Sequence, residues 1–278
     1  MSIRPQKIRR TVRAHFRHIL LFFIVLTPAV IVLKGGCGET GPAPAVPVFS
    51  YKIITSYFHD PDAFTQGLVI DNGVLYESTG EYGKSSLRRV DVQSGEILQK
   101  HALPPQFFAE GITIFGNRII QLTWKSQVGF IYDKNSFKLL RVFRYPGEGW
   151  GITHDGKNLI MSDGSSALRF LNTETLEEEK RINVTDESRP VALLNELEYV
   201  KGTIYANVWK TDRIALINPE TGKVKGWLDL AGILPKEPLR TRHIGVLNGI
   251  AYDSDKGALY ITGKRWPFLF QIEPLLSK

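Results

Sequence analysis

The alternation of apolar and polar residues after residue 50 predicts a domain built of short β-strands. Apolar or alternating runs recur along the chain and are separated by Gly, Pro, Asn and Asp residues, which favour tight turns. In the clearest stretch the pattern predicts strands at 194–200, 203–209, 213–217 and 223–228. No ten-residue stretch after residue 50 has a convincing helical period, so we expect an all-β fold.

Two sets of short motifs repeat through this region with similar periods. In each member of the first set, one residue stands directly before a pair that consists of Gly or Glu and an aliphatic residue. Successive members of this set are 44, 40, 45 and 53 residues apart. The residues in register are Gln66, Glu110, Trp150, Asn195 and Asn248. The second set has the pattern Asx-x-x-Ser/Thr and begins at Asp91, Asp133, Asn172 and Asn218. An Asx side chain that bonds the backbone two residues on indicates a turn between consecutive strands.

The repeat predicts a five-bladed β-propeller with four antiparallel strands in each blade, since four short strands every 40–50 residues or so are typical of a blade. The fifth repeat lacks its fourth strand and has strands at 247–253, 259–263 and 268–273. We expect the N-terminal strand-like run 51–58 to complete this last blade, which would remove two exposed sheet edges. The loop 235–245 is an insertion before that blade.

The N-terminal segment has the pattern of an export signal. Residues 1–18 are basic and residues 19–33 are nearly all apolar. Fifteen residues are short for a spanning helix, which needs about 20, and suit a signal peptide. Cleavage near Ala45, a retained anchor and lipidation of Cys37 all remain open, and each exports the remainder of the chain.

The sequence therefore divides into three expected parts. They are a signal peptide or membrane anchor at 1–34, a Gly/Pro-rich linker at 35–48, and a catalytic propeller at 49–278 that is periplasmic, secreted or anchored facing outward. The chain of 278 residues has a net charge of +7, but the segment 1–34 holds seven basic residues and no acid, so the remainder is neutral. No nucleic-acid partner is expected. A single cysteine excludes an intramolecular disulfide framework and a multi-cysteine zinc site.

Equivalent positions of a propeller face one another across its channel, so the first set of repeated residues would form a ring. That ring contains a single carboxylate, Glu110, among neutral groups, an arrangement suited to acid–base chemistry. Trp124 and Trp209 follow Glu110 and Asn195 by fourteen residues, and Lys264 follows Asn248 by sixteen. The hairpin between the first two strands of a blade would bring these three residues back to the same rim. Two alternatives remain open. The amide side chains, above all that of Asn248, would bond only the backbone of loops, or the tryptophans would fill the hydrophobic core. We expect such a structural role for Trp227 and Trp266.

At these residues the chain resembles the plant-type glutaminyl cyclases, or glutamine cyclotransferases, which include bacterial members. The resemblance covers roughly residues 48–274 and rests on several motifs in order: Phe64-Thr-Gln-Gly-Leu68, Phe108-Ala-Glu-Gly-Ile112, Gln121-Leu-Thr-Trp124, Leu194-Asn-Glu-Leu197, Ala206-Asn-Val-Trp209, Leu247-Asn-Gly-Ile250 and Thr262-Gly-Lys-Arg-Trp266. It implies a five-bladed propeller and an acyltransferase that converts N-terminal glutamine of peptides or proteins to pyroglutamate with loss of ammonia. It also implies that no diffusible cofactor is required and that a metal ion can lie in the central channel, with ligands that the sequence does not identify.

This chemistry assigns a role to each candidate residue. We expect Glu110 to carry the proton from the attacking amine to the leaving nitrogen. The expected donors to the oxyanion are Asn195, Gln66, Lys264 and the indole N–H of Trp150. The expected substrate-binding residues are Trp124, Trp150, Trp209, Phe64, Phe108 and Asn248.

Two other functions fit the same fold. One is a non-catalytic propeller scaffold that binds peptides or partners, because fold alone does not fix activity. The other is a metal-dependent lactonase-type hydrolase, which needs several channel carboxylates around a divalent cation, whereas the ring offers only Glu110. We expect a monomer that acts on peptides with N-terminal glutamine. Attachment to a membrane, one of the alternatives left open above, would be through its N-terminal segment.

Overall fold

The computed structural model describes residues 45–235 and 243–276. These residues form β-strands and turns and no helix, so the prediction of an all-β fold is confirmed. None of the described residues belongs to a helix long and apolar enough to cross a membrane. The expected signal or anchor, Cys37 and most of the linker lie outside the described residues.

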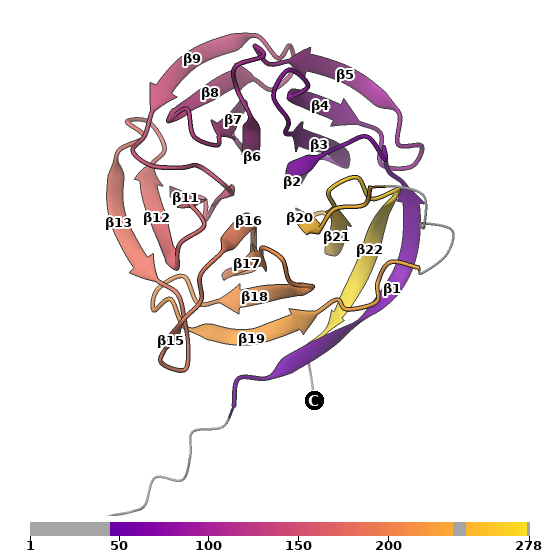
Figure 1. Ribbon diagram of the computed structural model, residues 1–278, viewed down its shortest axis with the longest axis vertical. Helices are drawn as coiled ribbons and strands as arrows, with labels where there is room; N and C mark the ends of the chain where they lie inside the picture. The colour runs from indigo at the N-terminus through magenta and orange to yellow at the C-terminus, as the bar shows by residue number, and fades with distance from the viewer. Residues whose placement is uncertain (1–44, 236–242, 277–278) are drawn as a thin grey trace, which may run out of the picture. The chain divides into compact units, whose positions relative to one another are not determined.

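Three antiparallel sheets of four strands each lie around a common centre (Figure 1). In each sheet the strands follow one another from the centre outward in chain order. The strands are β2 (Thr65–Asp71), β3 (Val74–Thr79), β4 (Ser86–Val90) and β5 (Ile97–Ala102); β6 (Ala109–Phe115), β7 (Arg118–Thr123), β8 (Val128–Asp133) and β9 (Leu139–Arg144); β10 (Ile152–His154), β11 (Asn158–Ser162), β12 (Ala167–Asn172) and β13 (Glu178–Asn183).

A fourth sheet of eight strands completes the circle, in the order β16-β17-β18-β19-β1-β22-β21-β20. Its strands are β16 (Leu194–Val200), β17 (Thr203–Val208), β18 (Arg213–Ile217), β19 (Val224–Asp229), β1 (Val48–Phe58), β22 (Phe268–Leu275), β21 (Ala258–Gly263) and β20 (Leu247–Asp253). Strand β1 pairs with β22 from Ser50 to Phe58, which confirms the predicted closure by the N-terminal strand. A short ribbon of β14 (Thr185–Asp186) and β15 (Arg189–Pro190) lies outside these sheets.

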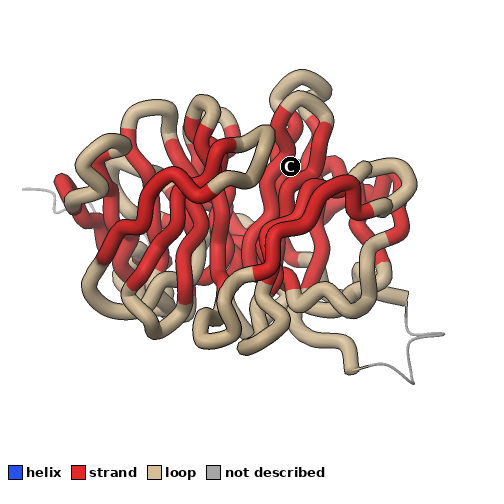
Figure 2. Tube along the Cα trace, turned by 90° about the horizontal axis from the view of Figure 1, so that it is seen from above, coloured by secondary structure: helices blue, strands red, loops and turns tan. Residues whose placement is uncertain are grey.

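The predicted Asx turns connect the third and fourth strands of a repeat. The side-chain oxygen of Asp91 accepts hydrogen bonds from the backbone N–H groups of Gln93 and Ser94 at 3.1 and 2.8 Å. The same pattern recurs at Asp133, Asn172 and Asn218. Figure 2 shows the strands between loops at both ends of the structure, and these turns lie at the end opposite the start of the innermost strands.

The hydrophobic core lies between neighbouring sheets. In one cluster, Val69 and Tyr76 of the first sheet pack with Ile112 and Ile119 of the second. Similar clusters follow around the structure. Each sheet therefore depends on its two neighbours for burial of its faces.

The innermost strands approach one another closely enough to need glycine. The N–H of Gly111 donates to the carbonyl of Trp150 at 2.7 Å. A Cβ atom at Gly111 would lie 2.7 Å from that carbonyl oxygen, and one at Gly151 would lie 2.1 Å from the carbonyl oxygen of Asn195. Only glycine permits such contacts, which explains the Gly that follows the ring residue in most repeats.

Where the fourth repeat has Glu196 in place of glycine, a carboxylate bonds the inner strands. Its two oxygens accept hydrogen bonds from the backbone N–H groups of Leu68 and Ile250 at 3.3 and 2.9 Å. Glu198 accepts hydrogen bonds from the N–H of Tyr252 at 3.0 Å and from the hydroxyl of Thr153 at 3.3 Å. These carboxyl groups satisfy polar groups that the sheets leave unpaired at their inner edges.

The buried acid Glu198 should make the stability of the protein depend on pH. Burial raises the pKa of Glu198 from 4.5 to about 8. Between these values the folded state keeps a proton that the unfolded state has released, so the free energy of unfolding falls as the pH rises from 4.5 to about 8. In Glu198→Gln we expect a smaller fall between pH 5 and pH 8, measured by urea unfolding at both pH values. The exposed Glu273→Gln serves as control; an equal fall in wild type and Glu198→Gln would contradict the assignment.

Candidate active site

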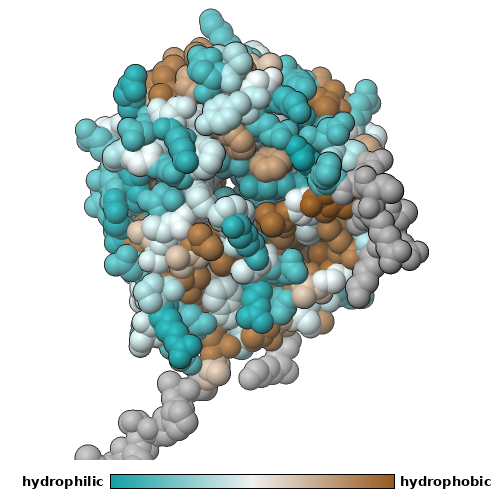
Figure 3. Space-filling model, in the orientation of Figure 1, coloured by the Kyte–Doolittle hydropathy of each residue, from teal (hydrophilic) through white to brown (hydrophobic). Residues whose placement is uncertain are grey.

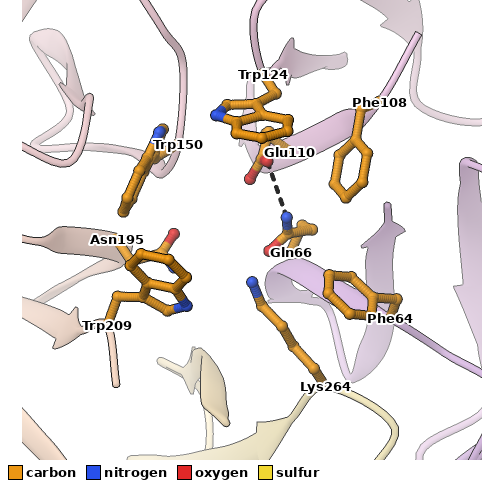
Figure 4. Close-up of a pocket in the computed structure, with 9 residues that line it drawn as sticks. All are labelled: Phe64, Gln66, Phe108, Glu110, Trp124, Trp150, Asn195, Trp209 and Lys264. Atoms are coloured by element: carbon orange, nitrogen blue, oxygen red, sulfur yellow. Dashed lines mark hydrogen bonds between the residues drawn. The ribbon is translucent and has the colours of Figure 1, made fainter. Parts of the chain in front are cut away.

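A cavity of about 180 Å³ lies where the innermost strands begin. On this measure of volume one water molecule needs about 10–15 Å³, so the cavity has room for a group at least the size of one side chain. Its walls are Phe64, Gln66, Phe108, Glu110, Trp124, Trp150, Asn195, Trp209 and Lys264 (Figure 4). The space-filling view shows a hollow in the middle of the molecule (Figure 3). Nine of the ten residues that the sequence singles out therefore line one cavity.

Irregular strand pairing aims the ring residues at this cavity. The register between β2 and β3 shifts between Thr65 and Gly67, around Gln66. The same kind of shift surrounds Glu110, Asn195 and Asn248 at the start of β6, β16 and β20. Such bulges redirect a side chain, and the sequence analysis did not foresee them.

The hairpins bring the tryptophans back beside these positions. The backbone N–H of Trp124 donates to the carbonyl of Phe108 at 3.0 Å, and that of Trp209 donates to Leu193 at 2.9 Å. The side chains of Trp124 and Trp209 are half-buried and wall the cavity. The rings of Trp150 and Trp209 meet edge to face with centroids 5.5 Å apart. Trp227 and Trp266 do not line the cavity.

Glu110 is a buried carboxyl group with one neighbouring donor. The Nε2 of Gln66 donates to Oε1 of Glu110 at 2.8 Å, as the dashed line in Figure 4 shows. Burial raises the pKa of Glu110 well above 4.5; Lys264 lowers it in part, and Glu148 raises it further. Gln66, expected to be an oxyanion donor, thus donates to Glu110 and orients it.

Lys264 brings a second ionisable group to the cavity. Its side chain is buried, and Nζ lies 4.8 Å from the centre of the Phe64 ring. Burial lowers the pKa of Lys264 below 10.5, while the carboxyl of Glu110 raises it in part. The cavity thus holds an acid whose protonated form is favoured by burial and an amine whose neutral form is favoured by burial.

The indole N–H of Trp150 does not face an oxyanion. It donates to Oε2 of Glu148 at 2.9 Å, and the indole N–H of Trp124 donates to the same oxygen at 2.6 Å. This corrects the expectation that Trp150 is an oxyanion donor, because its only N–H on the ring is already engaged. The repeat gives no signal for Glu148, which lies two residues before a ring position in Gly147-Glu148-Gly149.

The two asparagines of the ring have different surroundings. Oδ1 of Asn195 is buried and has no hydrogen-bond partner among the described residues. Asn248 is fully buried, and its Nδ2 donates to the carbonyl of Thr65 at 3.0 Å and to Oε1 of Gln66 at 3.4 Å. Asn248 therefore lies behind Gln66 rather than in the cavity wall, which corrects its expected contact with substrate.

Residues 45–235 and 243–276 contain no group of three or more His, Cys, Asp or Glu side chains arranged to hold a metal ion. The carboxyl groups along the axis, Glu196 and Glu198, are bonded to backbone N–H groups instead. The channel metal that the family resemblance allows therefore stays a prediction, and the described residues offer no cluster of side-chain ligands for it.

Comparison with known proteins identifies the family of the chain. The profile of a family described as glutamine cyclotransferase matches residues 27–274. A glutaminyl-peptide cyclotransferase of Arabidopsis thaliana is 42% identical over 226 residues, which are 80% of this chain and 70% of the relative. The crystal structure of a glutaminyl cyclase of Myxococcus xanthus is 35% identical, with a TM-score of 0.76 over 82% of this chain and 98% of that one. The chain belongs to the glutamine cyclotransferase family.

Proposed function

We propose that this protein is a glutaminyl-peptide cyclotransferase, which converts the N-terminal glutamine of peptides or proteins to pyroglutamate and releases ammonia. One observation carries the proposal beyond family membership. A single buried carboxyl group, Glu110, faces a cavity the size of one side chain, walled by aromatic rings and otherwise charged only at Lys264. This arrangement is suited to the cyclisation of a bound glutamine side chain.

The reaction needs two proton transfers and no external nucleophile. The α-amine of the substrate attacks the carbon of its own γ-carboxamide, and the new C–N bond closes a five-membered ring. The bond to the amide nitrogen then breaks, and that nitrogen leaves as ammonia. Because the step is intramolecular, holding one flexible side chain in a folded shape supplies much of the rate.

Glu110 is suited to carry out both proton transfers. In its ionised form the carboxyl group takes a proton from the attacking amine, and in its protonated form it gives that proton to the leaving nitrogen. An ordinary glutamate is a weak base for an amine, and burial corrects this by raising the pKa of Glu110. The hydrogen bond from Gln66 fixes one oxygen.

The remaining polar groups act on the substrate amide. Lys264 is our candidate to stabilise the oxyanion of the tetrahedral intermediate, because it is a buried cation that lines the cavity. The unpartnered Oδ1 of Asn195 accepts a hydrogen bond from the substrate amine or amide. No step passes through a metal ion or a diffusible cofactor.

We further infer that the fold is a five-bladed propeller. The eight-stranded sheet divides into two four-stranded blades at β19 and β1, where only two residue pairs, in parallel register, join the strands. One blade is then β16 to β19, and the other is β20, β21, β22 and β1. The repeat of the sequence and the closing strand β1 support this interpretation.

The route of the protein out of the cytoplasm is also a proposal. The basic residues 1–18 and the apolar residues 19–33 suit a signal peptide or an N-terminal anchor. The catalytic domain at 49–278 would then act as a monomer in the periplasm, outside the cell, or facing outward from the membrane. N-terminal residues of secreted peptides would be accessible there.

Replacing Glu110 tests the activity and the proton shuttle together. Wild type incubated with a short peptide that begins with glutamine should release ammonia, measured by a coupled assay, with pyroglutamate seen by mass spectrometry. Glu110→Gln keeps the shape of the side chain but not its proton, so we expect kcat/KM to fall by about 10²- to 10⁴-fold. Glu174→Gln, at an exposed turn at the opposite end, is the matched control. Wild-type turnover in Glu110→Gln would remove this residue from the mechanism, and an inactive wild type would favour a non-catalytic scaffold.

Replacing Lys264 separates binding from transition-state stabilisation. If Lys264 acts on the oxyanion, kcat should fall more than KM rises in Lys264→Ala, and Lys264→Met, which keeps the packing on Phe64, should lose a similar factor in kcat. Because Lys264 lowers the pKa of Glu110, the acid limb of the pH profile of kcat/KM should move to higher pH in both variants. A change in KM alone would make Lys264 a binding residue.

A further inference from the structure

The loop between β9 and β10 is anchored on the wall of the cavity. The hydroxyl of Tyr145 donates to the carbonyl of Thr123 at 2.5 Å and accepts from the N–H of Thr123 at 2.9 Å. The N–H of Gly149 donates to the carbonyl of Trp124 at 3.0 Å. Hydrogen bonds therefore hold the loop on both sides of Glu148, and they place its side chain relative to Trp124.

One oxygen of Glu148 joins two walls of the cavity. Oε2 accepts both indole N–H groups, from Trp124 at 2.6 Å and from Trp150 at 2.9 Å. The two tryptophans come from different sheets, since Trp124 follows β7 and Trp150 precedes β10. Hydrogen bonds to an ionised acceptor are shorter and stronger than neutral ones, so this carboxylate fixes the orientation of both rings.

The two indole rings pack against the other aromatic side chains of the cavity wall. Trp150 meets Trp209 edge to face at 5.5 Å, and Trp124 meets Phe108 edge to face at 5.6 Å. Phe108 in turn meets Phe64 at 6.0 Å. Glu148 is therefore the one polar link in a continuous series of rings that surrounds the site of reaction.

Glu148 also contributes charge without touching the site of reaction. It raises the pKa of Glu110 in addition to the effect of burial. Its other oxygen faces outward, with Oε1 3.9 Å from Nζ of Lys125, which itself lies 4.0 Å from the centre of the Trp124 ring. The side chain of Glu148 does not line the cavity, so its influence on substrate passes through the indoles and through its field.

We propose that Glu148 is a positioning residue of the cyclisation: it holds the indoles of Trp124 and Trp150 in the orientation that folds the substrate glutamine for attack. This inference rests on the proposed function. Because misplacement by about 1 Å can cost roughly 100-fold in rate, the aromatic walls need such a link. Lys264 and Glu148 then act in opposite directions on the same carboxyl group.

Two substitutions separate the two effects. Glu148→Ala removes the acceptor, and we expect kcat/KM for a glutamine-initiated peptide to fall roughly 10- to 100-fold, with a changed near-UV circular dichroism spectrum of the tryptophans. Glu148→Gln keeps an oxygen that can accept both indole N–H groups but has no charge. It should recover most of kcat/KM at the pH optimum and shift the acid limb of the pH profile to lower pH, opposite to the Lys264 variants. Glu174→Gln, which removes a carboxylate far from the cavity, should leave kcat/KM, the near-UV spectrum and the acid limb of the pH profile unchanged.

The outcomes distinguish this inference from the proposed function. An inactive wild type overturns the proposed function and the inference with it. An active wild type together with unchanged kinetics and spectrum in Glu148→Ala overturns the inference alone. If Glu148→Ala does not fold, an unmoved acid limb in Glu148→Gln overturns it, because a merely structural role for Glu148 would not shift that limb.

Discussion

The close approach of the innermost strands at the centre is the constraint on which the rest of the structure depends. Each sheet presents an inner edge whose backbone groups are not paired within the sheet, and these edges meet around the centre. The glycines that follow the ring residues permit contact between backbones, as at Gly111 and Gly151, and Glu196 satisfies the N–H groups that no backbone carbonyl reaches. Because every inner strand is fixed against the next at this one residue, the side chain just before it is fixed too. The ring residues converge on one cavity for that reason.

This packing also sets the electrostatics of the cavity. The same contacts that exclude water from the inner strands bury Glu110 and Lys264 among aromatic rings, and burial favours the neutral form of each. Their mutual attraction opposes that effect, and the field of Glu148 adds to it for Glu110. The acid–base behaviour of the site is therefore a balance between burial, one cation and one anion, all held by elements of different sheets.

The period of the sequence was enough to predict the strands, the Asx turns, the closing strand β1 and the residues that gather at the cavity. The strands and turns follow from local residue patterns, and the convergence on the cavity follows because equivalent positions of successive repeats surround the same axis. Both kinds of pattern can be recognised in the sequence. The period could not predict which polar groups pair across the cavity. The bond from Gln66 to Glu110, the withdrawal of Asn248 behind Gln66, and the capture of the Trp150 indole by Glu148 depend on bulges and on one loop that differs from its counterparts. The period also could not predict that two repeats share one eight-stranded sheet, which arises because β1 pairs with β19 as well as with β22.

Three buried glutamates near the axis show why burial alone does not identify a catalytic group. Burial raises the pKa of Glu110, Glu196 and Glu198 alike. Both oxygens of Glu196 and of Glu198 are engaged by backbone N–H or hydroxyl groups of neighbouring strands, and neither residue borders the cavity. Glu110 borders the cavity and accepts its hydrogen bond from the amide side chain of Gln66. A proton shuttle needs a raised pKa, a carboxyl oxygen open to the substrate and a rigid support at once, and among the three only Glu110 has all of them.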